Sequence, residues 1–273
     1  MIDTLVLSGG GVKGAAFLGA YTYLLEKELI KNIKNIISCS IGSFIAVCIS
    51  MNISNKLMYS IIHNVKVDYE LENICLSDFS NHGFFDNKIF YSIIKHLLKH
   101  KYNIEKISLK DFYDKTKINN EIKIYNYTNK KTEYYNHINN PDMDLALLIT
   151  ASTSIPLLNK YIEYNGDYLL DGGISGSYPV LKNKKYENYI GLCFNKDEIL
   201  NEPDDIIQFI TFLLIGRDDE ICEEYKNKKR IIKINTDISM TDFDISEEKI
   251  NELIKNGYNS IKDFHINNKK YFL

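Results

Sequence analysis

The sequence predicts an α/β protein in which helices cover the faces of a parallel or mixed β-sheet. Two short apolar runs carry this prediction: residues 2–7 end at a glycine-rich loop, and residues 35–39 end at Ser40. A helical segment follows each run. Short apolar runs are typical of buried parallel strands, and the order strand–loop–helix–strand is typical of βαβ units.

The elements of the N-terminal part can be placed in order. We expect a strand over residues 2–7, a glycine loop over 8–14 and a helix over 15–28. A second strand, 35–39, turns sharply at Ser40 into an apolar helix that runs to about Met51. Connections of this kind place consecutive strands side by side in one sheet.

Weaker patterns cover the rest of the chain. We expect helices at 55–65, 86–100, 142–150 and 203–226, and strands at 188–194 and 230–234. Residues 121–136 predict strands around a turn near Asn129, and residues 161–170 predict a hairpin that turns at Asn165-Gly166. The last helix should begin at Ser246 and end at Gly257, a residue type that commonly caps helix C-termini.

Composition limits the class of protein. The 273 residues, with no internal repeat or linker, fit one domain that spans residues 1–273. The formal net charge is −3 and the lysines are scattered, so we expect no nucleic-acid partner. No Asp, Glu or His cluster resembles a calcium or zinc site, so we expect no metal and no cofactor.

The sequence favours a soluble, intracellular protein. Its N-terminus has no basic and apolar leader, and the longest apolar run, 206–216, is interrupted and too short to span a bilayer. The five cysteines lack CxxC spacing and read as free thiols of a reducing, cytoplasmic compartment. Any membrane contact would therefore be peripheral.

The glycine loop allows two interpretations. Gly9, Gly11 and Gly14 have dinucleotide-binding spacing, but the second strand ends without the acidic residue that would hold a ribose. Alternatively, the N–H groups of consecutive glycines can stabilise a developing oxyanion. We favour an oxyanion site at Gly9, Gly10 and Gly11.

Ser38-Cys39-Ser40-Ile41-Gly42 has the form small-x-Ser-x-Gly between a strand and a helix, which is typical of a nucleophile elbow. Such a turn exposes the central hydroxyl, and Gly42 allows strand and helix to approach closely. Ser38 stands where glycine is usual, which keeps the position small. We therefore expect Ser40 to be a nucleophile.

A serine nucleophile needs a base, and Asp171 is the best candidate. It ends an apolar run and precedes Gly172 and Gly173. None of the six histidines lies in a comparable glycine-rich or acidic setting after a late strand. A suitably placed aspartate can accept the serine proton if its surroundings adjust its pKa.

Together, the Gly-rich loop, the small-x-Ser-x-Gly elbow and the Asp-Gly-Gly turn, in this order, resemble the patatin-like phospholipase family. The run 7–14 is similar to the family's oxyanion block, and 151–156 is similar to the segment before its aspartate strand. The resemblance covers about residues 4–260.

The resemblance implies a three-layer α/β/α sandwich with a mostly parallel central sheet. It also implies a Ser40–Asp171 dyad that hydrolyses lipid acyl esters through an acyl-serine intermediate, with peripheral contact to a lipid substrate at a membrane surface. Supporting roles would fall to Lys13, Gly14, Gly42 and Gly172, and Lys13 could either assist near the phosphate or pair with a carboxylate. Two alternatives stay open: a catalytically idle lipid-binding protein of the same fold and a dinucleotide-binding enzyme.

Overall fold

The computed structural model describes residues 2–64, 83–85, 87–179, 186–195, 229–240, 242 and 244–272. Within these residues the main sheet has eight strands in the order β10-β9-β1-β2-β4-β8-β7, with β5 paired to β4 beside this path. Its parallel strands are β1 (Thr4–Leu7), β2 (Asn35–Cys39), β4 (Asn119–Asn126), β9 (Tyr189–Phe194) and β10 (Ile231–Ile234).

The remaining strands make the sheet mixed, as the sequence predicts. β5 (Lys131–Tyr135) and β8 (Asp167–Asp171) run antiparallel to β4, and β7 (Ile162–Tyr164) forms a hairpin with β8. The hairpin turns at Asn165 and Gly166, both with positive φ, as expected. A separate pair joins β3 (Gly83–Phe85) to β6 (Leu157–Asn159).

Seven α-helices lie within the described residues: α1 (Ala15–Glu26), α2 (Ile41–Ser50), α3 (Asn55–Asn64), α4 (Lys88–Tyr102), α5 (Leu109–Thr116), α6 (Leu145–Ser152) and α9 (Glu247–Asn267). α5 was not expected from the sequence, although Ser108 caps it by accepting the N–H of Asp111 at 3.1 Å. The helix expected at 203–226 lies outside the described residues.

Both faces of the central strands are buried, which explains why their sequences read as continuous apolar runs. On one face, Leu5, Leu7 and Ile36 join the main core, to which α1, α2, α4, α6 and α9 contribute. On the other face, Val6 and Ile37 pack with a group of buried tyrosines, Tyr178, Tyr186 and Tyr189. Burial on both sides is the pattern expected of parallel strands. The α/β fold class predicted from the sequence is confirmed.

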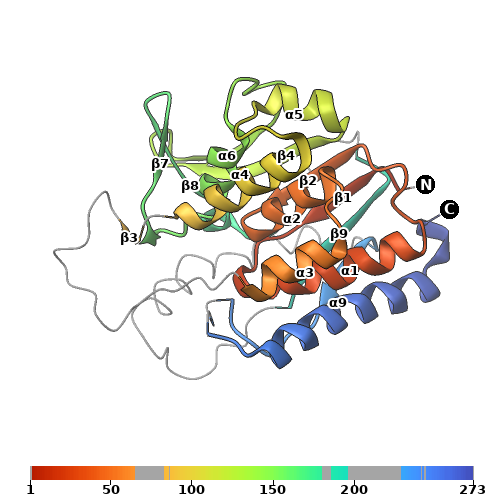
Figure 1. The fold of residues 1–273 in the computed structure, drawn as a ribbon. Helices are drawn as coiled ribbons and strands as arrows, with labels where there is room; N and C mark the ends of the chain where they lie inside the picture. Colours follow the sequence, from red (N-terminus) through yellow and green to blue (C-terminus); the bar gives the residue numbers. More distant parts are fainter. Residues whose placement is uncertain are drawn as a thin grey trace.

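The prediction that the last helix ends at Gly257 is wrong. α9 begins after Ser246, as expected, but continues to Asn267. Figure 1 shows α9 lying alongside α1, and Gly257 is buried where the two helices meet. A Cβ at this position would overlap the backbone of Ala16 in α1. The glycine therefore allows a close helix–helix contact and does not cap the helix.

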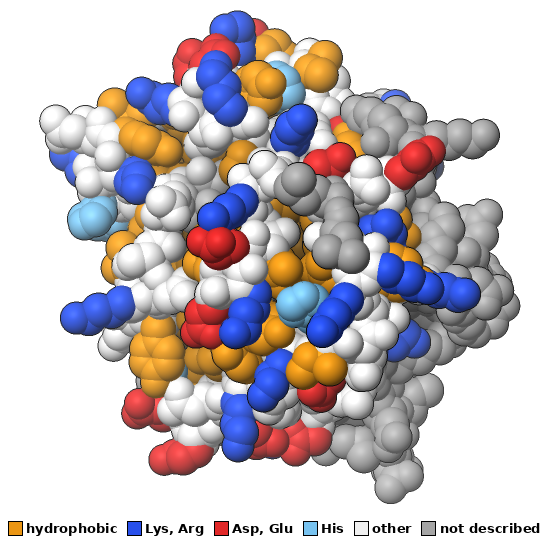
Figure 2. Space-filling model, turned by 90° about the vertical axis from the view of Figure 1, so that its right-hand side faces the viewer, with side chains coloured by type: hydrophobic (Ala, Val, Ile, Leu, Met, Phe, Trp, Pro, Cys, Tyr) orange, Lys and Arg blue, Asp and Glu red, His pale blue; other side chains and the backbone are white. Residues whose placement is uncertain are grey.

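Figure 2 shows the face that carries the two chain termini. Basic side chains are scattered there among acidic, polar and apolar ones and do not form one positive patch. Among the described residues, no helix is both long and apolar enough to cross a membrane.

The contact at Gly257 can be tested by substitution with alanine. Helix propensity alone would favour Gly257→Ala by up to about 1 kcal/mol. We expect overlap with α1 to outweigh this and to lower the free energy of unfolding by about 1–3 kcal/mol. Urea denaturation measures the change. Asn259→Ala, at an exposed position of the same helix, is the control and should stay within about 0.5 kcal/mol of wild type. Equal stability of the two variants would contradict the close contact.

Candidate active site

A small cavity of about 30 Å³ lies where β1, β2 and β8 end. The residues that line it are Gly9, Gly10, Gly11, Ser40, Ile155, Pro156, Asp171, Gly173, Ile174, Ser177 and Met240. The structure thus brings together all five residues that the sequence analysis selected as nucleophile, base and oxyanion site.

The register of β4 explains how Ser40 and Asp171 meet. β2 pairs with the first part of β4, up to Cys39 opposite Lys123, and β8 pairs with the last part, where Asp171 lies opposite Ile124. β5 pairs with β4 across both parts, so it must occupy the other edge. β2 and β8 therefore share one edge of β4, end to end, and Ser40 lies beside Asp171.

Ser40 has an unusual backbone conformation, with φ 51° and ψ −130°, between β2 and α2. A non-glycine residue in such a region stores about 1–3 kcal/mol of strain. The turn directs the side chain toward β8, and Ser40 Oγ donates a hydrogen bond to Asp171 Oδ2 at 2.6 Å. The N-terminus of α2 also begins here, and its partial positive charge favours negative charge at the serine.

The C-terminal end of α6 holds both residues in place. The Oγ of Ser152, the last residue of α6, accepts the backbone N–H of Ser40 at 3.0 Å and donates to the carbonyl of Lys123 at 3.0 Å. Two residues later, the carbonyl of Ser154 accepts the N–H of Asp171 at 2.9 Å. One short segment therefore fixes the strained serine and its carboxylate partner.

Burial raises the pKa of Asp171 from 3.8 to about 6. Four neighbours act in the opposite direction: the Ser40 hydroxyl, the N–H of Gly173 at 2.7 Å, the positive charge of Lys123 and the thiol of Cys39 at 3.9 Å. The carboxylate is therefore ionised at neutral pH but is a stronger base than an exposed aspartate.

Lys123 is only 2% exposed, which is unusual for a lysine. Its Nζ donates to the carbonyl of Ser175 at 3.1 Å and to the carbonyl of Gly176. These bonds attach the turn that follows Asp171 to β4, and the charge stabilises the carboxylate form of Asp171.

Hydrogen bonds distinguish the glycines of the loop. The N–H of Gly9 donates to the carbonyl of Ser177 at 2.9 Å, and the N–H of Val12 donates to the carbonyl of Met240 at 3.3 Å. The N–H groups of Gly10 and Gly11 donate to no backbone carbonyl of the described residues, so they are the candidate oxyanion donors. Gly9 shapes the loop by fixing it to the turn after Asp171.

The four residues expected to support the site surround the cavity without lining it. A Cβ at Gly42 would clash with the backbone of Ser8, just after β1. A Cβ at Gly172 would clash with the backbone of Lys123 in β4. Gly14 packs against the side chain of Ile41. Lys13 is 1% exposed and lies inside the fold, away from the cavity lining.

No described histidine lies at the site. Of the six histidines, all but His82 are described, and none of those lines the cavity. Within the described part of the chain, Asp171 is the titratable side chain bonded to the Ser40 hydroxyl.

Several residues that build the site were missed from the sequence. Lys123 alternates with isoleucines in a strand and therefore reads as a solvent-facing position. Met240 and Ser177 carry no local signal at all, because only the folded chain brings them to the glycine loop. Ser152 and Ser154 lie in the segment 151–156, which the family resemblance marked without assigning them a role.

Together, the sheet, the strained serine at the end of β2 and the neighbouring glycine loop define an α/β protein with a nucleophile elbow. The model of the family described as patatin-like phospholipase matches residues 5–182. The chain belongs to this family, as the sequence motifs indicated.

Two viral proteins are similar in sequence. Uncharacterized protein R571 of Acanthamoeba polyphaga mimivirus is 24% identical over 279 residues, covering 96% of this chain and 93% of that protein. Probable lipid hydrolase 463L of Invertebrate iridescent virus 6 is 28% identical over 190 residues, covering 68% of this chain and 64% of that protein.

Solved structures support the patatin-like fold. VipD from Legionella pneumophila superposes with a TM-score of 0.65 at 17% identity, covering 97% of this chain and 67% of VipD. The type III effector protein ExoU superposes with a TM-score of 0.56 at 12% identity, covering 100% of this chain and 54% of ExoU. This chain therefore spans only about half the length of ExoU, and the likeness concerns the fold.

Ser152→Ala tests whether α6 positions Ser40. The change removes the acceptor of the Ser40 N–H, and we expect the elbow to relax. Turnover of an ester substrate should fall by about 10–100-fold, because small misplacements at a reacting centre are costly. The free energy of unfolding should fall by about 1–3 kcal/mol, because buried groups lose their partners.

Ser50→Ala is the matched control. Ser50 is a buried serine of α2 that bonds Asn120 at 3.1 Å, away from the cavity lining. Its loss should lower stability to a similar extent but leave turnover near the wild-type value. If both variants lose turnover equally, Ser152 has no positioning role.

Proposed function

We propose that this protein hydrolyses fatty-acyl esters of membrane lipids, as a phospholipase A does, with Ser40 as nucleophile and Asp171 as base. The observation that carries the proposal is the 2.6 Å hydrogen bond from Ser40 Oγ to a buried Asp171 carboxylate, beside a cavity lined by glycines.

In the first half of the reaction, Ser40 Oγ attacks the ester carbonyl carbon while its proton passes to Asp171 Oδ2. The carbonyl oxygen becomes an oxyanion and accepts hydrogen bonds from the N–H groups of Gly10 and Gly11. Donors aimed at a developing oxyanion are each worth about 10²–10³ in rate. When the intermediate collapses, the leaving alcohol takes the proton from Asp171 and the acyl group stays on Ser40.

In the second half, water attacks the acyl-Ser40 carbonyl and transfers a proton to Asp171. Collapse of this intermediate returns the proton to Ser40 Oγ and releases the fatty acid. Asp171 thus alternates between base and acid. A pKa of about 6 suits both roles, because proton transfer is most efficient when the pKa lies near the working pH.

Membership of the patatin-like phospholipase family and similarity to a probable lipid hydrolase support a lipid ester as the substrate. In this proposal the enzyme takes its substrate from a membrane surface by peripheral contact. The dinucleotide alternative is disfavoured, because β2 ends at Cys39 and is followed by Ser40, without the acidic residue that would hold a ribose hydroxyl.

Release of fatty acid from phosphatidylcholine vesicles tests the proposal. Ser40→Ala and Asp171→Asn should each lower turnover by about 10⁴-fold or more, since nucleophile and base act as a unit. Asp171→Asn should also raise the free energy of unfolding at pH 8. The native pKa of about 6 lies above the unfolded value of 3.8, so the wild-type protein loses stability as the pH rises from about 4 to 6, by up to about 3 kcal/mol, whereas Asn does not ionise.

Asp167→Asn is the matched control, because Asp167 lies on the same strand but bonds Asn126 outside the cavity lining. It should retain wild-type turnover. More than about a tenth of wild-type turnover in Ser40→Ala or Asp171→Asn would overturn the assignment. Vesicle binding by wild-type protein without release of fatty acid would instead favour an idle lipid-binding protein.

A further inference from the structure

The loop between β10 and α9 lies over the glycine loop, although it belongs to neither the elbow nor the aspartate turn. We call residues 236–240 the C-terminal strap. The strap lies beyond residue 182, where the match to the family model ends. Its end, Met240, nevertheless lines the cavity that contains Ser40 and Asp171.

The strap contacts the glycine loop directly. The carbonyl of Met240 accepts the N–H of Val12 at 3.3 Å. Gly11, with φ +52°, packs so closely beneath it that a Cβ would overlap the Met240 carbonyl. The strap therefore forms one wall of the site immediately beside the glycine loop.

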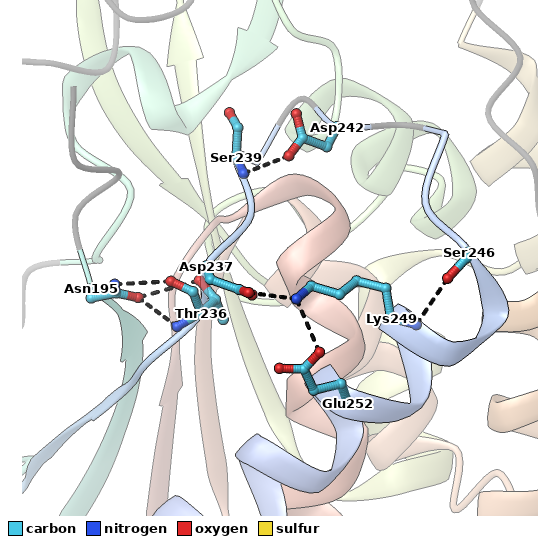
Figure 3. Close-up of polar contacts among 8 residues, drawn as sticks. All are labelled: Asn195, Thr236, Asp237, Ser239, Asp242, Ser246, Lys249 and Glu252. Carbon is cyan, nitrogen blue, oxygen red and sulfur yellow. Dashed lines mark hydrogen bonds and ion pairs between the residues drawn. The ribbon is translucent and has the colours of Figure 1, made fainter. Parts of the chain in front are cut away.

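Polar contacts hold the strap, and the one between Asp237 and Lys249 is exposed (Figure 3). The Asn195 side chain accepts the N–H of Thr236 at 2.9 Å and donates to its carbonyl at 3.1 Å. Lys249 of α9 pairs with Asp237 at 2.6 Å, although the Asp237 side chain is 68% exposed. An exposed ion pair of this kind adds little stability. The anchor at Asp237 can therefore be broken at small cost.

The cavity is too small for the substrate of the proposed function. Its volume of about 30 Å³ is room for only a few water molecules, whereas pockets that enclose small ligands measure about 300–1,000 Å³. Movement of a wall would make room for an acyl chain beside Ser40. Three apolar lining residues belong to segments next to Asp171: Ile155 and Pro156 follow Ser154, which bonds the N–H of Asp171, and Ile174 lies in the turn after Asp171. The fourth, Met240, belongs to the strap.

We propose that Met240 determines which acyl chains the enzyme accepts, as the movable wall of the acyl site. This inference rests on the proposed function and adds a specificity-determining residue to it. A methionine side chain is apolar and flexible, so it suits contact with the hydrocarbon part of a lipid ester and not with its polar head. The anchors at Asn195 and Lys249 hold Met240 in the closed position.

The test uses p-nitrophenyl esters that share one leaving group and differ in chain length. The quantity measured is the ratio of kcat/KM for octanoate to kcat/KM for acetate. We expect Met240→Ala to raise this ratio about tenfold, the scale at which pockets discriminate between small apolar groups. Met240→Leu, which keeps the volume of the side chain, should leave the ratio within about twofold of wild type.

A second pair of variants tests the anchoring. Asn195→Ala frees the strap and should raise the ratio in the same direction. The control is Asn139→Ala, because Asn139 also bridges backbone groups within a loop, donating to Tyr134 and accepting from Asn136, but does not line the cavity. Its ratio should equal that of wild type. An unchanged ratio in Asn195→Ala would overturn the anchoring role.

The outcomes separate this inference from the proposed function. If wild-type protein releases fatty acid from phosphatidylcholine vesicles and Ser40→Ala does not, the proposed function stands. An unchanged ratio in Met240→Ala then overturns the role of Met240 alone. If wild-type protein hydrolyses neither these esters nor phosphatidylcholine, the proposed function and this inference fail together.

Discussion

The hydrogen bond between Ser40 and Asp171 depends on the pairing of β4. This strand is longer than β2, and the free part of its edge is taken by β8. A shift of β8 by one residue would turn the Asp171 side chain to the other face of the sheet, because side chains alternate along a strand. The register of two strand pairs therefore sets the geometry of the site.

Buried polar groups around this bond stabilise a conformation that would otherwise be costly. Ser40 has a strained backbone, and Asp171 is a carboxylate inside the protein. Ser152 satisfies the N–H of the serine, while Lys123 supplies charge and holds the turn after the aspartate. The surrounding structure must compensate for both features, as is common where strain is kept at functional sites.

Much of the fold could be predicted because its signals are local. The bounds of β2 match the prediction, since an apolar run ends where the elbow begins. Gly257 was misread because a helix cap and a close helix contact both favour glycine, and only the packing of α9 on α1 decides between them. Lys123 and Met240 could not be identified, because strand register and a distant loop bring them to the site.

The most direct measurement of the central claim is the rate at which a soluble fluorophosphonate modifies the protein between pH 4 and pH 8. In the proposed mechanism, activation of Ser40 requires the ionised form of Asp171, so the rate should rise with pH around a midpoint near 6. Peptide mass spectrometry should place the label on Ser40. In Asp171→Asn the labelling should be slow and independent of pH. A flat profile for wild-type protein, or a label on another residue, would contradict the account.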